Sequence, residues 1–340
     1  MPRVTFGLRI PPCASPTAVA ACARAAEDVR FAIAWLPDSQ FIWRDVWASL
    51  ALTATATEKI LIGTCVTNFE TRHASVTAAA ASTIEELAPG RMLLGVGTGD
   101  SAIKTLGLRP TKLELMREQI ELVRLLQTGE EVEFRGRAMR MKAAPGHATP
   151  VYLAANGPKA LALAGELADG VIMLVGLAPA LIENALRHVA EGAARAGREI
   201  DDIDLCIGTF CHVTDDERVK ARITKPYVVG TAQTGGRESL RAIGIDIDPP
   251  AVVGGIYPDM AHAEDWAEAI DAAEEWVTDE MGLRYADEFC CVGDAEYVIA
   301  QLEGAVGLGV SNFYIRHFES YTLPNELVAS FGEKIIPHFA

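Results

Sequence analysis

The stretch that decides the fold is ILIGTCVTNFETRHASVTAAAASTIEELAPGRMLLGVGTGD, residues 60–100. It contains two apolar runs, residues 60–66 and 92–96, on either side of a helical segment, and each run ends in a polar loop. The second loop, residues 95–101, has three glycines, two hydroxyl side chains and one carboxylate. Because glycine lets backbone N–H groups come close to a ligand, we interpret Gly97, Thr98 and Gly99 as part of a cofactor site. The layout predicts a parallel β/α enzyme with its chemistry at strand ends.

The bulk composition predicts a soluble globular protein. Half of the 340 residues are hydrophobic, which suffices for one large core or two ordinary ones. The net charge of −16 is spread along the chain, so we expect neither nucleic acid nor an anionic membrane as a partner. No apolar stretch reaches the roughly 20 residues of a membrane span. Seven cysteines without a Cys-x-x-Cys pair fit a reducing compartment, and we expect a cytoplasmic location.

A strand-like run, a polar loop and an amphipathic helix recur along the chain. The first half contains four such units roughly 30 residues apart, a spacing typical of parallel βαβ structure. Their strands are predicted at residues 4–8, 33–36, 60–66 and 92–96, and their helices at 17–29, 45–57, 73–87 and 112–128. The second half adds strands at 151–154, 171–174, 203–212 and 313–316, with helices at 158–167, 178–196, 215–229 and 294–306.

This pattern of eight strands and eight helices predicts a (β/α)8 TIM barrel. The doubly wound alternative requires a G-x-G-x-x-G turn after the first strand, and the loop RIPPC at residues 9–13 has none. Residues 1–340 are therefore interpreted as a single domain. A run VEFRGRAMRM at residues 132–141 predicts a hairpin insertion at about residues 131–142.

A second insertion precedes the last predicted strand. Residues 231–280 are rich in glycine and proline and include a very acidic helix from residue 263 to 276. A long excursion at this place in a barrel is typical of a segment that covers the mouth, so we expect a substrate lid or a dimer segment. The alternative is a solvated decoration without a role at the site.

Several segments resemble the luciferase-like family of flavin- and deazaflavin-dependent oxidoreductases. They are residues 63–100, YLAANGPKALALAGELADGVI at 152–172, VTDEM at 277–281 and EKIIP at 333–337. The methylenetetrahydromethanopterin reductase branch is the most similar. The resemblance implies a (β/α)8 barrel, usually a homodimer, that binds FMN or the 8-hydroxy-5-deazaflavin coenzyme at the carboxyl ends of the strands. In such proteins a non-prolyl cis peptide ends the third strand, and the matching bond here joins Cys65 and Val66.

The resemblance also assigns the cofactor contacts. The ring is expected near the end of the third strand and the loop after the fourth, and the anionic tail near the loops after the two strands that follow the hairpin. The expected contacts are Cys65, Val66, Thr67, Asn68, Gly97, Thr98 and Gly99 for the ring, and Ala155, Asn156, Gly157, Pro158, Lys159, Val175 and Gly176 for the tail. Pro158 marks the first turn of a helix, whose free N–H groups attract an anion. The alternative for this loop is a helix start without a ligand.

Four residues are candidates for catalysis. Asp100 matches an acidic position of the methylene-pterin reductases that is thought to handle protons; capping the next helix is the alternative. Asp38 and Ser39 stand where many deazaflavin-dependent relatives carry Asp-His, and Ser39 does not titrate near neutrality as histidine does. Arg9 stands where the reductases have Glu, and this cation indicates an anionic or carbonyl-bearing substrate or a salt bridge at the rim.

Two further positions are relevant to the site. Arg316 and His317 follow the last strand, where barrel enzymes place substrate-binding or catalytic side chains. His73 is expected to start the helix after the third strand. No zinc-ligand spacing, Walker loop or serine elbow is present in the sequence, so we expect no metal and no hydrolase.

We therefore expect an oxidoreductase that transfers hydride between a reduced flavin-type coenzyme and a small organic substrate. One alternative is a two-component monooxygenase that receives reduced FMN from a separate flavin reductase and inserts oxygen into a small organic substrate. A second alternative is a flavin-binding protein without turnover. The altered acid and base positions at residues 9 and 39 keep these alternatives open.

Overall fold

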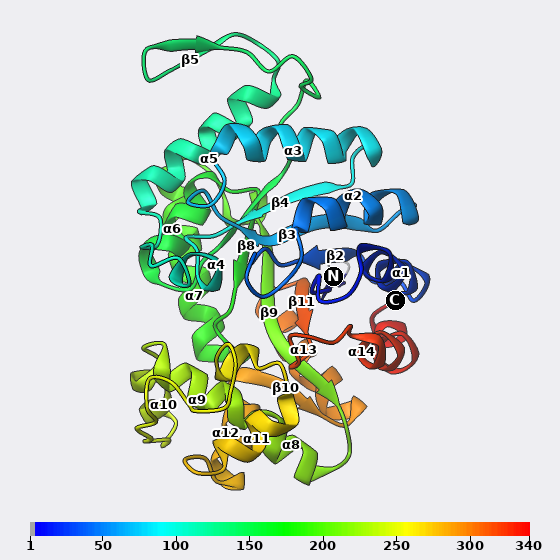
Figure 1. Ribbon diagram of the computed structural model, residues 1–340, viewed down its shortest axis with the longest axis vertical. Coiled ribbons are helices and arrows are strands. Elements are labelled where there is room, and N and C mark those ends of the chain that lie inside the picture. Colours follow the sequence, from blue (N-terminus) through cyan, green and yellow to red (C-terminus); the bar gives the residue numbers. More distant parts are fainter. Residues whose placement is uncertain (1–3) are drawn as a thin grey trace.

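A computed structural model describes residues 4–340 and shows a barrel of parallel strands surrounded by helices (Figure 1). The strands are β1 Thr5–Arg9, β2 Ile33–Leu36, β3 Leu61–Thr67, β4 Met92–Val96, β5 Val132–Phe134, β6 Arg137–Met139, β7 Val151–Ala154, β8 Gly170–Met173, β9 Asp204–Val213, β10 Cys290–Gly293 and β11 Asn312–Arg316. Nine of them form the main sheet, and all of these except β10 close into a ring. The order around the ring is β1, β2, β3, β4, β7, β8, β9, β11, with β11 paired to β1. The predicted (β/α)8 barrel is thus confirmed.

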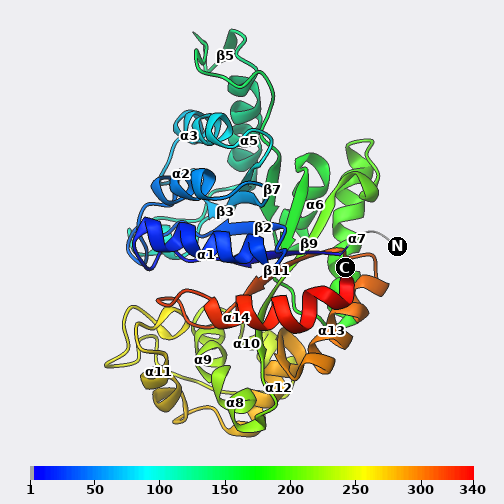
Figure 2. The ribbon, with the colours of Figure 1, turned by 90° about the vertical axis from the view of Figure 1, so that its right-hand side faces the viewer.

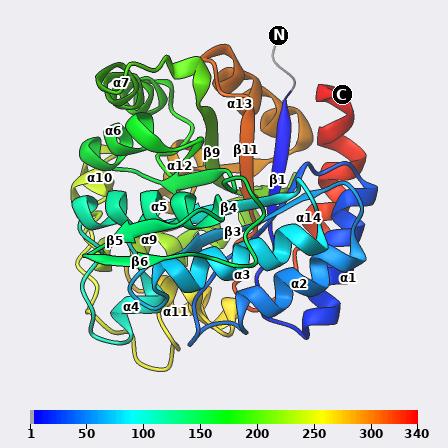
Figure 3. The same ribbon diagram turned by 90° about the horizontal axis from the view of Figure 1, so that it is seen from above.

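Helices follow the strands in the expected alternation. They are α1 Pro16–Asp28, α2 Val46–Ala56, α3 Ala74–Leu87, α4 Ser101–Lys104, α5 Leu113–Gln127, α6 Pro158–Leu167, α7 Pro179–Arg195, α8 Glu217–Ile223, α9 Lys225–Gln233, α10 Arg237–Ala242, α11 Trp266–Ala273, α12 Asp279–Phe289, α13 Ala295–Gly307 and α14 Asn325–Ser330. Helices α1, α2 and α3 lie in chain order along one side of the barrel (Figure 2), and α6 and α7 lie next to each other on another side (Figure 3).

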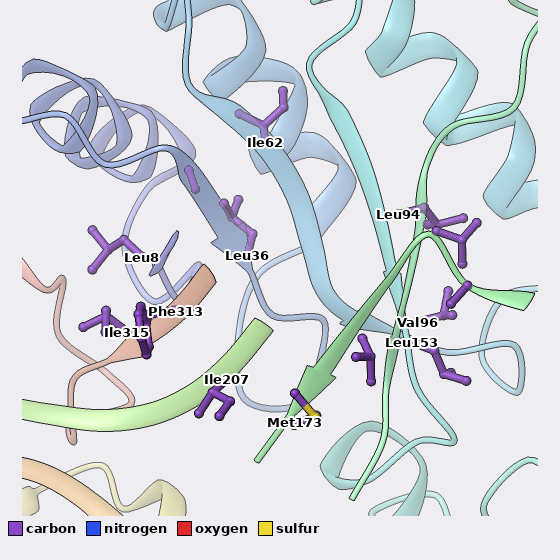
Figure 4. Close-up of a cluster of buried hydrophobic side chains, with 14 of the residues drawn as sticks. Leu8, Leu36, Ile62, Leu94, Val96, Leu153, Met173, Ile207, Phe313 and Ile315 are labelled. Atoms are coloured by element: carbon purple, nitrogen blue, oxygen red, sulfur yellow. The ribbon is translucent and has the colours of Figure 1, made fainter. Parts of the chain in front are cut away.

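The layer between strands and helices is the main hydrophobic core. Every barrel strand contributes to it, and ten of the side chains are labelled in Figure 4. They are Leu8, Leu36, Ile62, Leu94, Val96, Leu153, Met173, Ile207, Phe313 and Ile315, and none is more than 1% exposed. Burial of this layer against the helices is the main source of stability of the barrel, because each buried aliphatic side chain contributes about 1.5–3 kcal/mol.

The inside of the barrel is filled by three aromatic side chains, Trp35, Tyr152 and Tyr314. The ring centroid of Trp35 lies 5.4 Å from that of Tyr152 and 6.5 Å from that of Tyr314, both in edge-to-face geometry. Glycines on neighbouring strands leave the space for them. A Cβ on Gly7 would lie 2.6 Å from the Trp35 indole Nε1, and a Cβ on Gly63 would lie 2.6 Å from Trp35 Cζ3. The barrel is therefore a packed core, and a ligand can only bind at its mouth.

The structure corrects three details of the sequence prediction. The predicted helix at residues 215–229 is two helices, α8 and α9, because Pro226 lies in the first turn of α9 and starts a new helix. Strand β10 was not predicted, and it extends the sheet by pairing with the second half of β9, while β8 pairs with the first half. The predicted acidic helix at residues 263–276 is shorter, since α11 covers only Trp266–Ala273.

Both predicted insertions have defined structures. The hairpin is confirmed: β5 and β6 pair antiparallel around a turn in which Arg135 and Gly136 have φ of 51° and 74°. It projects away from the barrel (Figure 1). Residues 231–280 form short helices and loops that share a separate hydrophobic cluster with α9, α12 and β10, and this cluster includes Phe210 and Phe318 from the barrel.

Replacing Gly63 by alanine tests how tightly the barrel interior is packed. The new methyl group would lie 2.6 Å from the carbonyl oxygen of Leu93 as well as from Trp35, so either the ring or the strand has to move. We expect Gly63→Ala to lower the free energy of unfolding by about 1–3 kcal/mol in urea denaturation. The matched control is Gly304→Ala in α13, where no atom lies within 4 Å of the new Cβ and about 0.5–1 kcal/mol of stabilisation is expected. Equal effects of the two changes would contradict this description of the interior.

Candidate active site

A cavity of about 550 Å³ opens at the carboxyl ends of the barrel strands. Its lining comes from the loops after β2, β4, β7 and β8, from the middle of β9, from Arg316 at the end of β11, and from α9, α12 and the 231–280 excursion. The excursion contributes Thr231, Tyr257 and His262 to the wall. The position of the cavity agrees with the sequence prediction that the chemistry lies at strand ends.

The junction of β3 and β4 forms one side of this end of the barrel. The peptide bond between Cys65 and Val66 is cis, as the family resemblance implied, and the pairing of β3 with β4 shifts register between Thr64 and Thr67. The backbone N–H of Gly97 donates to the carbonyl oxygen of Thr67 at 3.0 Å.

The glycines after β4 are explained by packing, and not by the close approach of a ligand that the sequence predicted. A Cβ on Gly97 would lie 2.8 Å from Val66 Cγ2, and a Cβ on Gly99, at φ 97°, would lie 2.6 Å from Ile103 Cδ1. Close packing against the irregular end of β3 and against α4 therefore requires these glycines. The N–H of Gly97 is used within the sheet and is not free for a ligand.

Asp38 is a buried carboxylate at the carboxyl end of β2, although it does not itself line the cavity. It is 9% exposed, accepts a hydrogen bond from the hydroxyl of Thr67 at 2.7 Å, and lies 3.7 Å from Nε of Arg72. Burial raises the pKa of Asp38, and the Thr67 hydrogen bond and the Arg72 charge oppose part of that rise. Its position beside the cis junction and its raised pKa give it the properties of a group that can hold a proton.

Ser39 and Gln40 connect the loop after β2 to the loop after β4. Ser39 is 1% exposed, and its Oγ accepts a hydrogen bond from the Ser101 hydroxyl at 3.0 Å. The side-chain amide of Gln40 donates to the carbonyl oxygen of Ala102 at 2.7 Å. These two contacts hold the short helix α4 against the end of β2.

Asp100 lines the cavity but lies at its edge. Its side chain is 69% exposed and forms an ion pair with Lys104. The Asp100 carboxylate is therefore largely in contact with solvent, which argues against the proton-handling role. The capping alternative is wrong, because the Asp100 side chain accepts no hydrogen bond from the first turn of α4.

The loop after β3 is shaped by its own side chains. Asn68 is 2% exposed, and its Oδ1 accepts hydrogen bonds from the N–H groups of Glu70 and Thr71 at 3.1 and 2.9 Å. His73 caps α3, because its Nδ1 accepts the N–H of Ser75 at 3.2 Å, which confirms that His73 starts the helix. Thr67 is occupied by Asp38, so these side chains build the loop in which Asp38 and the cis bond lie.

The loop after β7 leads into an open helix N-terminus. Gly157 precedes α6, and no atom lies within 4 Å of a Cβ built on it. Among the described residues, the N–H groups of Lys159 and Ala160 have no hydrogen-bond acceptor. Ala155 is buried, whereas Asn156, Gly157, Pro158 and Lys159 are exposed. Free N–H groups and open space at the positive end of a helix fit an anionic group.

The loop after β8 lies beside this helix start. Asn156 Oδ1 accepts the N–H of Leu174 at 2.8 Å, which ties the two loops together. Gly176 lines the cavity at φ 89°, and a Cβ there would lie 2.8 Å from the carbonyl oxygen of Glu288. Val175 is half-buried and packs against the main core. The two segments expected to bind a cofactor tail are therefore brought together, although only Asn156 and Gly176 of them line the cavity.

Arg9 is buried below the mouth and not at the rim. It is 2% exposed, donates to the carbonyl oxygen of His317 at 3.4 Å and to Ser320 Oγ at 3.2 Å, and lies 5.2 Å from the ring centre of Trp43. Burial lowers its pKa. Among the described residues no carboxylate lies within ion-pair distance of Arg9, so the rim salt bridge is wrong.

Arg316, the last residue of β11, and His317, which follows it, have different surroundings. Arg316 lines the cavity and lies 3.9 Å from the ring centre of Phe210. His317 lies outside this cavity, and its Nε2 is 2.9 Å from the carbonyl oxygen of Thr322. Burial lowers the pKa of His317 to about 3, so the ring is neutral and donates from Nε2.

The sequence analysis missed the aromatic wall of the cavity. The ring centres of Phe210 and Tyr227 are 4.0 Å apart, and Trp266 lies 5.2 Å from Tyr227. These rings come from β9, α9 and α11, which are far apart in the chain. Phe210 and Tyr227 line the cavity, and Trp266 packs against Tyr227 without lining it. No local pattern marks Tyr227 as a site residue, because only the packing of the excursion on β9 brings these rings together.

A barrel with a cavity and a buried carboxylate at its strand ends has the architecture of a barrel enzyme. The family model described as Luciferase-like monooxygenase matches residues 5–312. The chain therefore belongs to the luciferase-like monooxygenase family, and it is an oxidoreductase of that family.

Named relatives support the assignment over most of the chain. The 5,10-methylenetetrahydromethanopterin reductase of Methanopyrus kandleri is 30% identical over 369 aligned positions, which cover 100% of this chain and 99% of the relative. The reductase of the same name from Methanolobus tindarius is 33% identical over 262 positions, covering 74% of this chain and 78% of the relative. An F420-dependent glucose-6-phosphate dehydrogenase of Nakamurella multipartita is 34% identical over 210 positions, covering 56% of this chain and 61% of the relative.

Solved structures show the same fold. The coenzyme F420 dependent tetrahydromethanopterin reductase from Methanopyrus kandleri superposes with a TM-score of 0.77 at 24% identity, covering 99% of this chain and 100% of that chain. An F420-dependent secondary alcohol dehydrogenase in complex with an F420-acetone adduct superposes with a TM-score of 0.76 at 20% identity, covering 99% of both chains.

Two kinds of feature are absent from residues 4–340. No helix there is both long enough and apolar enough to cross a bilayer. The same residues contain no group of three or more His, Cys, Asp or Glu side chains placed to hold a metal ion. All seven cysteines are free thiols.

The buried His317 predicts a pH dependence of stability. Its folded pKa of about 3 is below the ordinary value of 6.5, so the unfolded chain takes up a proton as the pH falls below 6.5 while the folded protein does not. The stability that neutral His317 contributes is present above that pH and is lost toward pH 3, by about 1–2 kcal/mol between pH 7 and pH 5.

His317→Gln keeps a donor for Thr322 and removes the titration. We expect the loss of unfolding free energy between pH 7 and pH 5 to be smaller in this variant, measured by urea denaturation. The control is His338→Gln at an exposed histidine whose side chain is 45% accessible. Identical pH profiles of wild type and His317→Gln would show that His317 is not the group responsible.

Proposed function

We propose that this protein is a coenzyme F420-dependent oxidoreductase that transfers hydride to or from a small organic substrate. The observation that carries the proposal is the open N-terminus of α6 close to the irregular end of β3, since only β4 separates β3 from β7 in the ring of strands. Relatives named as F420-dependent or as methylenetetrahydromethanopterin reductases support the choice of coenzyme. When bound, the 8-hydroxy-5-deazaflavin supplies hydride transfer at a ring carbon.

The residues of the chain have separate tasks in this proposal. The coenzyme ring is held beside a surface formed by the end of β3 and the loop after β4. This surface consists of Cys65, Val66, Thr67, Asn68, Gly97, Thr98 and Gly99. The anionic tail is held at the first turn of α6, because this turn offers free N–H groups. The residues around the tail are Ala155, Asn156, Gly157, Pro158 and Lys159, together with Val175 and Gly176. Asp38 holds or releases the proton that accompanies hydride transfer, since it is buried and its pKa is raised. Ser39 positions α4, and the pair of Asp100 and Lys104 lies at the entrance.

One specific observation favours a second candidate, the FMN-dependent monooxygenase. The matched family carries that description, and at residue 39 a serine stands where a titratable histidine would serve hydride chemistry. This candidate requires a separate flavin reductase as a partner. Binding of flavin without turnover is the remaining alternative. A homodimer and a cytoplasmic location stay predictions.

Cofactor titrations of wild type and two variants at position 157 test the proposal. The open space and the φ of −92° at Gly157 accept a side chain without a clash. Gly157→Asp places a carboxylate at the start of α6, and Gly157→Asn places a neutral group of the same shape there. Both residues are good helix caps, so the fold is preserved. We expect the aspartate variant to bind coenzyme F420 at least tenfold more weakly than the asparagine variant, with a smaller difference at high salt.

The same titrations decide between the cofactors. Wild type is expected to bind F420 more tightly than FMN and to exchange hydride with reduced F420 under anaerobic conditions. Tighter binding of FMN together with an oxygen-dependent product would establish the monooxygenase instead. Equal F420 affinities of the two position-157 variants would show that the tail does not bind at α6.

A comparison of two carboxylates tests the proton role. Asp38→Asn still accepts the Thr67 hydrogen bond but cannot release a proton, so we expect kcat to fall about 10²-fold or more. Asp100→Asn, at the exposed edge, is expected to change kcat less than threefold. Turnover is followed as the change in coenzyme absorbance with an accepted substrate, and the F420 dissociation constant of each variant is measured as the control. A larger effect at Asp100 would reverse the assignment.

A further inference from the structure

The charged side chains that line the cavity are all paired except one. Asp100 pairs with Lys104, and Asp259 Oδ1 lies 3.0 Å from Nδ1 of His262. Asp259 also accepts the backbone N–H groups of Ala261 and His262, each at 2.9 Å. Arg316 is the remaining charged group of the lining, and no described carboxylate lies within ion-pair distance of it.

No residue within the described range 4–340 accepts a hydrogen bond from the Arg316 side chain either. Its guanidinium lies over the ring of Phe210 at 3.9 Å and 5.9 Å from the ring centre of Tyr314. Its Nε–H is buried and has no acceptor among the described residues. A buried donor without an acceptor costs about 1–3 kcal/mol, and more when the group is charged. The aromatic contacts fix the plane of the guanidinium but supply no acceptor.

Arg9 adds a second positive charge behind Arg316. The two arginines lie at the ends of adjacent strands, since β11 pairs with β1. The charge of Arg316 is close enough to lower the pKa of Arg9 further, beyond the effect of burial. Among the described residues, the hydrogen bonds of Arg9 go to neutral groups, including the His317 carbonyl oxygen and Ser320 Oγ. We call Arg9 and Arg316 the arginine pair.

The arginine pair is separate from the helix start proposed for the cofactor tail. In the ring of eight barrel strands, β7, which leads into α6, is opposite β1, which ends in Arg9. Two places that favour negative charge therefore lie on opposite sides of one mouth. The net charge of the chain is −16, so its overall charge does not explain two places that attract an anion.

We propose that the arginine pair binds an oxyanion of the substrate, so that the substrate is a small organic anion carrying a carboxylate or a phosphate. Arg316 contacts the anion and supplies the donors that have no acceptor, while Arg9 strengthens the positive potential from behind. The inference rests on the proposed function, because it assigns the α6 side of the mouth to the cofactor tail. Arg9 is buried and Arg316 is half-buried, and neither has a counter-ion among the described residues, so a substrate that supplies negative charge stabilises both.

Three ligands of similar shape test the proposal on the protein without cofactor. Benzoate and phenyl phosphate carry an oxyanion on a benzene ring, and benzamide is the neutral analogue of benzoate. We expect calorimetric titration to show at least one of the two anions binding tenfold or more tightly than benzamide. Whichever anion binds more tightly identifies carboxylate or phosphate as the recognised group. Two anions that bind no better than benzamide, including the case in which none of the three binds, overturn the proposal.

Variants locate the binding. Arg316→Gln is expected to abolish the preference for the anion, Arg316→Lys to retain part of it, and Arg218→Gln, at an exposed arginine of α8, to leave it unchanged. Circular dichroism checks that each variant is folded, and Arg316→Lys serves as the test if Arg316→Gln is not. A preference that survives in every Arg316 variant, or that is lost in Gly157→Asp instead, overturns the proposal.

The F420 titration distinguishes this inference from the proposed function. If F420 binds but no anion preference is found, only the inference at the arginine pair fails. If F420 does not bind, the proposed function fails, while the benzoate and benzamide comparison still reports whether Arg316 is an anion site.

Discussion

The filling of the barrel interior by Trp35, Tyr152 and Tyr314 is the constraint on which the rest of the structure depends. Three large rings fit inside one ring of strands only because glycines such as Gly7 and Gly63 take the facing positions. Edge-to-face contacts between the rings add to the burial of their area. The filled interior leaves no channel through the barrel. Binding is thereby confined to the mouth, where the strands end and side chains from separate units meet.

The mouth is organised by how each strand ends. The pairing of β3 with β4 shifts register before Thr67, whose hydroxyl donates to Asp38, and Gly97 lets β4 approach this irregular end. On the far side, β9 continues past the barrel to pair with β10, which places Phe210 against the aromatic cluster of the excursion. The excursion is thus anchored by a core of its own, and this core holds one wall of the cavity in place.

Charge is distributed unevenly around this mouth. Asp38 is a buried carboxylate with Arg72 at its side, whereas Arg9 and Arg316 have neutral or aromatic neighbours. The start of α6 adds a further positive end on the opposite side. A redox coenzyme with an anionic tail and an anionic substrate are complementary to this arrangement, since each would bring negative charge to a separate positive place.

The sequence by itself determined the barrel, the hairpin and the family, because these depend on local periodicity, turn residues and segments that are contiguous in the chain. It also predicted the cis bond at Cys65 and the helix start at His73. Only the tertiary structure decided how the candidate residues are used. Asp100 follows a buried strand as Asp38 does, yet one is exposed and the other buried, since exposure depends on which distant segments cover each loop. The isolation of Arg316 from every described carboxylate and the aromatic wall around Tyr227 likewise depend on contacts between residues far apart in sequence, which no local pattern records.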